Sequence, residues 1–62
     1  MAPTKQELST RDVRAKLADV INDAAAYGTI TYVMSRGRRI AAVVPVADAE
    51  AIERQRPEPS SD

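Results

Sequence analysis

The sequence predicts an α+β fold, one small domain with the order strand, helix, strand, strand, helix and an antiparallel sheet. Three observations lead to this prediction. A capped apolar stripe at helical spacing covers residues 10–27, and two strand-like segments flank a glycine turn within residues 29–44. An Ala- and Glu-rich segment with helical spacing follows at residues 47–55. We expect residues 1–46 to form the folded domain, residues 47–55 a short second helix, and residues 56–62 a disordered tail.

Both ends of the first helix are marked in the sequence. Ser9 and Asp12 fit the S-x-x-[DE] capping box, in which the Ser9 hydroxyl accepts a hydrogen bond from the backbone N–H of residue 12. Gly28 fits a left-handed cap at the other end. Between them, apolar residues at helical spacing predict a single stripe that faces the core: Val13, Leu17, Val20, Ile21 and Ala24.

Three strands are expected around this helix. Residues 6–8 precede the helix as a short first strand. Residues 29–35 alternate and are rich in β-branched and aromatic side chains, and residues 39–44 return as an apolar strand that Pro45 ends. Gly37 lies between these two segments and is free to adopt positive φ, so we expect an antiparallel hairpin.

A core built from this chain alone is expected to be marginal in stability. A chain of 62 residues buries only about 60% of the surface that its unfolded form exposes. It contains no Cys, which excludes disulfides, and no His, which removes the usual zinc ligands. Self-association remains as the source of further burial, and we expect an obligate homodimer.

The composition argues against an enzyme and against a membrane protein. The chain lacks His and Cys, and its two glycines, Gly28 and Gly37, cannot form a phosphate-binding loop. Asp19 and Asp23 share a helix face, and we interpret them as solvated surface rather than as a cation site. No stretch approaches the roughly 20 apolar residues that span a bilayer, and the N-terminus lacks the apolar run of a signal peptide. We therefore expect a cytoplasmic protein without a cofactor.

The net charge is zero, but the charges are unevenly distributed. Residues 1–45 contain seven basic and four acidic side chains, whereas residues 46–62 contain two basic and five acidic ones. Arginines cluster at the start of the helix and at the hairpin turn: Arg11, Arg14, Arg36, Arg38 and Arg39. A guanidinium group donates two parallel hydrogen bonds to a phosphate or to a guanine edge. If the turn folds beside the helix start, these arginines form one DNA-binding surface. The alternative is solvated charge, partly paired with Asp12 or Glu7.

Two motifs resemble those of the Phd/YefM antitoxin family. Residues 9–17, S-T-R-D-V-R-A-K-L, look like the family's S-x-x-E-x-R-x-N-L helix start. Residues 33–45, V-M-S-R-G-R-R-I-A-A-V-V-P, are similar to its V-I-T-R-x-G-[RK]-P-V-A-x-L-V-P hairpin. The resemblance covers roughly residues 6–54.

The resemblance implies a β-α-β-β-α domain that dimerises, largely through its sheet, and represses its own operon by binding a palindromic operator. The family's arginines match Arg14, Arg36 and Arg38. Lys16 stands where the family usually has Asn, Ser35 where it has Arg, and Arg39 where it has Pro. Together with the other residues of the helix start and the hairpin, the expected DNA-binding set is Thr10, Arg11, Arg14, Lys16, Arg36, Arg38 and Arg39.

The resemblance also implies a cognate toxin, which the family neutralises with a C-terminal segment that orders on binding. Residues 47–62 stand in that position, and the expected toxin-binding residues are Ala47, Ala51, Ile52 and Arg54. This region is shorter than in the family, so either the chain was shortened or it binds its toxin with few contacts. Met1 leads us to expect a complete front end. The alternative function is a protein-interaction module that inhibits a partner without binding DNA.

Overall fold

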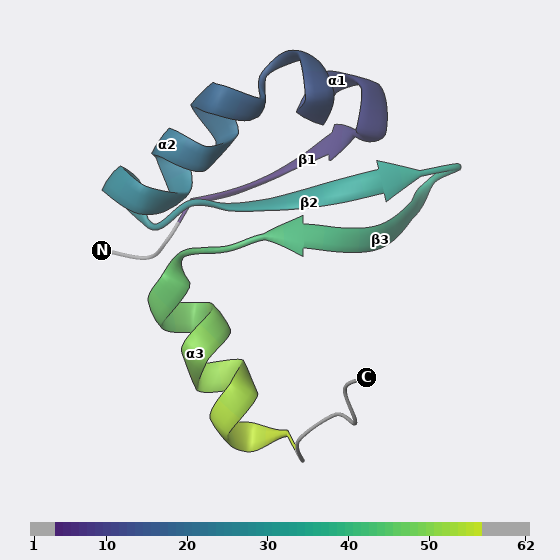
Figure 1. Ribbon diagram of the computed structural model, residues 1–62. Helices are drawn as coiled ribbons and strands as arrows, with labels where there is room; N and C mark the ends of the chain where they lie inside the picture. The colour runs from purple at the N-terminus through teal and green to yellow at the C-terminus, as the bar shows by residue number, and fades with distance from the viewer. Residues whose placement is uncertain (1–3, 57–62) are drawn as a thin grey trace.

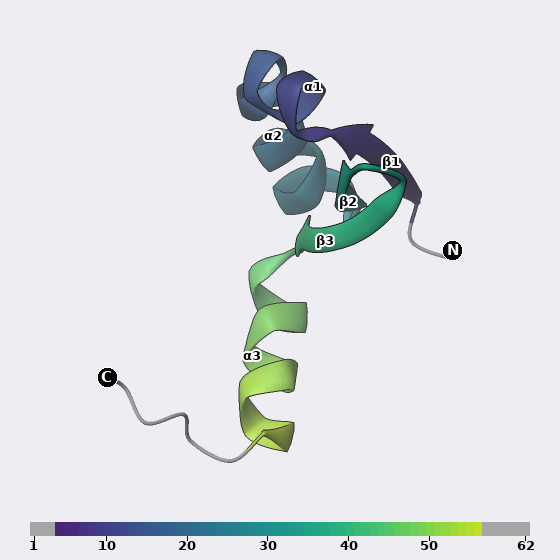
Figure 2. The same ribbon diagram turned by 90° about the vertical axis from the view of Figure 1, so that its right-hand side faces the viewer.

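The computed structural model describes residues 4–56, which form a three-stranded sheet with two helices on one face (Figure 1). The elements follow in the order β1 (Lys5–Ser9), α1 (Thr10–Ala15), α2 (Leu17–Tyr27), β2 (Ile30–Ser35), β3 (Arg38–Val43) and α3 (Val46–Gln55). Figure 2 shows α1 and α2 together on one side of the sheet and α3 extending away from it. The predicted α+β class is confirmed. Of the tail expected at residues 56–62, only Arg56 lies within the described residues, where it ends α3.

The sheet is mixed, so the prediction of an antiparallel sheet is wrong for its first strand. The strand order is β1-β2-β3, and β1 runs parallel to β2, pairing Lys5 with Ile30 and Ser9 with Met34. The connection explains this direction. Helices α1 and α2 return the chain from the end of β1 to the start of β2, and a strand that follows such a crossover lies parallel to the strand before it.

The antiparallel hairpin of β2 and β3 is confirmed. Ser35 pairs with Arg38 across the turn, and the register then shifts between Val33 and Met34. Ile40 lies between the two β3 residues that pair with them and is therefore an extra residue in the strand. Such a bulge bends and twists an edge strand, which makes its outer edge a poorer template for further strand pairing.

The caps of the helical region are those that the sequence predicts. The backbone N–H of Asp12 donates to the Ser9 hydroxyl oxygen at 3.1 Å and fixes the start of α1. Gly28 has φ 72° and ψ 20° at the end of α2, and its N–H donates to the carbonyl oxygen of Ala24. Because this left-handed conformation is strained for a residue with a β-carbon, glycine is favoured there.

The single helix predicted over residues 10–27 is instead two helices that meet at Lys16. Lys16 has φ −117° and ψ 25°, outside the helical region, and separates α1 from α2. A change of ψ at one residue alters the rotational phase of everything that follows it, so the predicted apolar stripe does not stay on one face. Val13, Val20 and Ala24 are buried, whereas Leu17 and Ile21 remain 47% and 53% exposed.

The core lies between the two helices and the sheet and is very small. Its buried apolar side chains within the described residues are Val13, Val20 and Ala24. Thr31, in the central strand, is fully buried beneath the helices, and the Gln6 side-chain amide donates to its hydroxyl oxygen at 2.9 Å. This hydrogen bond removes the penalty of burying an unpaired hydroxyl group.

Helix α3 confirms the second predicted helix in position, but none of its residues is buried. It begins after Pro45 and leaves the sheet as an arm (Figure 2). In the part of the chain that the structure describes, no helix is long and apolar enough to cross a membrane.

Candidate nucleic-acid interface

Helix α1 supplies the first half of the candidate interface. Arg11 and Arg14 are exposed and three residues apart, so they lie on neighbouring positions of the helix surface. Together with Thr10 and Ala15 they line a shallow, open pocket. The Ser9 cap holds this short helix at the end of β1, which fixes the direction in which the two guanidinium groups leave the fold.

The hairpin turn supplies the second half. Arg36 and Gly37 are the only two residues between β2 and β3, and both have positive φ, 54° and 77°. Positive φ at both central residues defines a type I′ turn, the tight connection that matches the twist of the flanking strands. Arg36 and Arg38 are both exposed at this tip. The turn therefore presents two arginines on a short connection rather than on a long loop.

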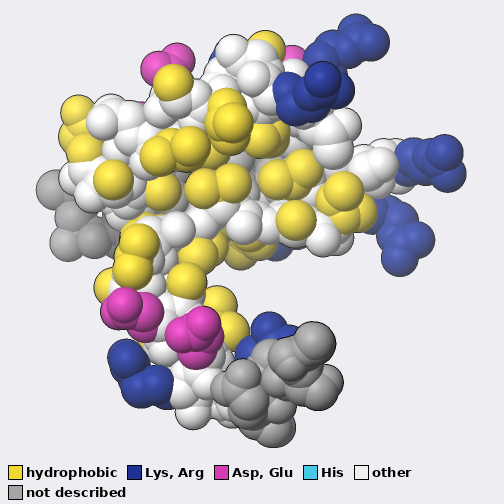
Figure 3. Space-filling model, viewed as in Figure 1, with side chains coloured by type: hydrophobic (Ala, Val, Ile, Leu, Met, Phe, Trp, Pro, Cys, Tyr) yellow, Lys and Arg dark blue, Asp and Glu magenta, His cyan; other side chains and the backbone are white. Residues whose placement is uncertain are grey.

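The parallel pairing of β1 and β2 brings these two halves to the same end of the molecule. Ser9, the last residue of β1, pairs with Met34, and Met34 lies next to the residue that opens the turn. The start of α1 and the tip of the hairpin therefore share one end of the sheet. Figure 3 shows Lys and Arg side chains at this end, over α1 and the turn, whereas α3 carries both acidic and basic side chains. We call Arg11, Arg14, Arg36 and Arg38 the arginine cluster.

The arginine cluster has no carboxylate partners in the described part of the chain. The salt bridge found within residues 4–56 joins Arg39 to Glu7 at 2.7 Å. Of the pairings with Asp12 or Glu7 that we considered for the five arginines, the one with Glu7 is formed by Arg39, and none is formed by the four arginines of the cluster. Surface arginines without a counter-charge repel one another. A polyanion that binds at this end of the molecule relieves this repulsion and is attracted by all four guanidinium groups.

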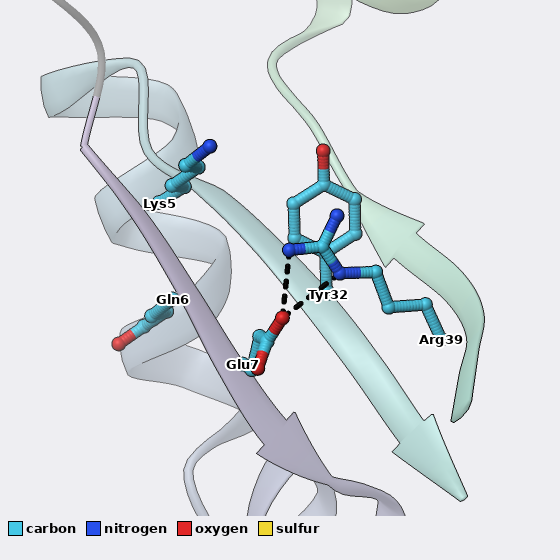
Figure 4. Close-up of a pocket in the computed structure, with 5 residues that line it drawn as sticks. All are labelled: Lys5, Gln6, Glu7, Tyr32 and Arg39. Carbon is cyan, nitrogen blue, oxygen red and sulfur yellow. Dashed lines mark hydrogen bonds and ion pairs between the residues drawn. The ribbon is translucent and has the colours of Figure 1, made fainter. Parts of the chain in front are cut away.

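Arg39, the fifth predicted arginine, lies elsewhere, on the uncovered face of the sheet. Its Nε and terminal nitrogen donate to one carboxylate oxygen of Glu7 at 2.9 and 2.7 Å. Its guanidinium carbon also stands 3.8 Å from the centroid of the Tyr32 ring (Figure 4). An exposed ion pair of this kind contributes about 0.2–1 kcal/mol, and a cation–π contact a similar amount. The structure thus gives Arg39 partners within the chain, apart from the arginine cluster.

The remaining predicted residues lie at three further places on the helices. Thr10 opens α1 beside the arginine cluster, whereas Lys16 is exposed at the junction of α1 and α2. The residues predicted to bind a toxin all lie on α3, and only Ala51 among them is half-buried: Ala47, Ala51, Ile52 and Arg54.

Sequence reasoning missed the arrangement of Glu7, Tyr32 and Arg39 on the uncovered face. These residues come from three different strands, and Glu7 reaches Tyr32 only through the parallel register. A local pattern holds no information about that register. Sequence reasoning also gave no indication that Arg36 itself, and not only Gly37, has positive φ.

Comparison with known proteins found no matching family model, no matching curated protein and no matching solved structure.

Proposed function

We propose that the chain is a DNA-binding antitoxin, which represses its own operon as a dimer and neutralises a cognate toxin through its C-terminal segment. The single observation that most supports DNA binding is the arginine cluster. Two separate elements bring four exposed arginines to one end of the molecule, and none has a carboxylate partner within the described residues. The motif resemblance to Phd/YefM antitoxins points the same way.

DNA fits this arrangement better than a small anion does. The pocket at α1 is open rather than enclosed, and the turn arginines lie on a separate element, so a ligand must extend from one to the other. A duplex offers regularly spaced phosphates, and a tight hairpin turn and a short helix are both narrow enough to approach a groove. Phosphate contacts provide affinity, and an arginine fork on a guanine edge provides sequence preference.

The chemistry of α3 supports the toxin-binding half of the proposal. This helix projects from the fold, buries none of its residues and leaves Ile52 45% exposed. Val46 at the start of the same helix is also exposed, and exposed apolar side chains on a projecting helix give a partner protein a surface to cover. The same feature favours the alternative, a module that inhibits a partner without binding DNA.

Binding to the DNA upstream of the chain's own gene, measured without any partner protein, separates the two functions. We expect the purified chain to shift this duplex at nanomolar to micromolar concentration, and a shuffled duplex of equal length only at concentrations at least tenfold higher. Equal affinity for both duplexes would remove the repressor role. No shift of either duplex at low salt would leave the partner-inhibiting module as the function.

A further inference from the structure

Helix α2 has a second apolar stripe that the core does not use. Leu17, Ile21 and Ala25 are four residues apart in turn, which places them along one side of the helix. Val20 and Ala24 face the core, whereas Leu17 and Ile21 remain about half exposed. The exposed stripe therefore lies beside the buried one.

A groove runs between this stripe and the end of the hairpin. Its walls are Ile21, Ala24 and Ala25 of α2 and residues 43–46, which end β3 and begin α3. No charged residue lines it. Figure 3 shows hydrophobic side chains as a band across the face bounded by α2 and β3. The groove lies at the end of β3 away from the turn, and therefore away from the arginine cluster.

We propose that a second copy of this chain occupies the groove, so that the α2–β3 face is the dimer interface. Within the described residues the folded core holds three buried apolar side chains, while six large apolar residues stay exposed, of which Ile21 and Val46 line the groove. A fold that buries so little apolar surface needs a partner to cover its exposed apolar residues whenever it is folded. A second copy of the chain is the one partner that is always present with it. Since the groove has no charge, two identical surfaces meet there without repulsion, as a twofold interface requires.

The uncovered face of the sheet fits a second copy less well. It displays the Glu7–Arg39 ion pair over Tyr32, and Lys5 and Arg39 line the hollow there. Burying charged groups at an interface removes their hydration, which offsets much of the gain from contact. The motif resemblance implies dimerisation largely through the sheet, whereas these contacts favour the α2–β3 face.

This interface also sets the separation of the two arginine clusters, a consequence that rests on the proposed function. The strand β3 has six residues, which span about 20 Å at roughly 3.3 Å each. If the two β3 strands continue one another across the groove, their turns lie on the order of 40 Å apart. This separation is comparable to the spacing of successive half-sites on one side of B-DNA, about 34–36 Å.

Single cysteines test the interface directly, because the chain contains none of its own. Ala25→Cys places a thiol in the groove, Ala42→Cys on the uncovered sheet face, and Ala15→Cys beside the arginine cluster. With a short bis-maleimide, we expect Ala25→Cys to form a covalent dimer at least tenfold faster than the other two. Faster cross-linking at Ala42 or Ala15 overturns the proposal.

A second measurement compares Ile21→Asp with the matched control Ile52→Asp by sedimentation equilibrium. Both residues are exposed isoleucines on helices, but only Ile21 lines the groove. We expect Ile21→Asp to raise the dimer dissociation constant more than 100-fold or to unfold the chain, and Ile52→Asp to leave a dimer of twice 6.7 kDa. A wild-type chain that is monomeric at micromolar concentration contradicts the interface.

These outcomes are distinct from failure of the proposed function. A groove dimer that binds no DNA leaves the interface correct and the repressor role wrong. A DNA-binding chain that cross-links through another face leaves the repressor role standing and removes the groove interface.

Discussion

Arg36 is held in a conformation that its side chain disfavours. Its φ of 54° lies in the left-handed region, where a residue with a β-carbon is strained by about 1–2 kcal/mol and where Asn and Gly are preferred. A tight turn of this kind gains nothing in stability from an arginine. The conformation agrees with the DNA-binding role that we propose for the exposed guanidinium group, since strain of this sort persists at sites where a side chain is needed.

Replacing Arg36 with Asn should therefore separate stability from DNA binding. We expect Arg36→Asn to raise the free energy of unfolding by about 1 kcal/mol, measured by urea denaturation, because Asn tolerates positive φ. The same change should reduce the magnitude of the salt slope of DNA binding by about 1.8 per dimer. Arg38→Asn is the control: Arg38 has no positive φ, so it should lose affinity without any gain in stability. Equal stability changes in both variants would show that strain at Arg36 is not relieved.

Arg14 tests the other half of the arginine cluster. It is exposed in the last turn of α1 and has no carboxylate partner in the described residues. We expect Arg14→Ala to weaken operator binding by about 1–3 kcal/mol if the side chain contacts a base edge. Circular dichroism should show unchanged helix content, and Arg54→Ala on α3 should leave DNA affinity intact. An unaltered affinity in Arg14→Ala would make this arginine plain surface charge.

Local chemistry predicted the special residues whose cause is local. The Ser9 cap, the left-handed Gly28 and the positive φ of Gly37 follow from rules that involve a few neighbouring residues, and the structure has all three. The partners of Arg39 follow from pairing between strands that are far apart in the chain. Rules that consider only neighbouring residues in the sequence cannot predict such a contact between strands.

At the level of elements, the same distinction separates the correct predictions from the wrong ones. The hairpin was predictable because its strands are neighbours and its turn has two residues. The parallel direction of β1 depends on the route of the chain over the sheet. The break at Lys16 interrupts a stripe that looks continuous in sequence, so its spacing alone predicts one helix.

Helix α3 is the element whose removal should matter least to the fold. It buries none of its residues, and a helix of ten residues is marginal in water without partners. We expect a chain ending at Val46 to lose less than about 1 kcal/mol of unfolding free energy. It should keep its affinity for DNA and lose any neutralisation of a toxin in a co-expression growth assay.

The full-length chain provides the comparison for this deletion. Loss of the dimer on removal of residues 47–62 would place α3 within the dimer interface. Retained neutralisation would move the toxin-binding surface from α3 to the folded domain.

For the whole molecule, we expect folding and association to be one process, because the core is small. Three buried apolar side chains in the described part of the chain are few for a stable monomer, and in the dimer that we propose the exposed stripe of α2 supplies further burial. The melting temperature of the protein should therefore rise with protein concentration, by about 5 °C for each tenfold increase in concentration. Differential scanning calorimetry over a hundredfold range measures this rise. A constant melting temperature over that range means a stable monomer.

The most direct test of the central claim is the salt dependence of DNA binding by the purified chain. If the arginine clusters of a dimer each place four guanidinium groups on phosphates, the slope of log K against log salt should be about −7. Fluorescence anisotropy with a duplex from upstream of the gene, titrated between low and physiological salt, measures it. A slope near that value, falling in magnitude when any arginine of the cluster is removed, is the result we predict. A slope near zero, or one that only Arg39→Ala alters, would contradict it.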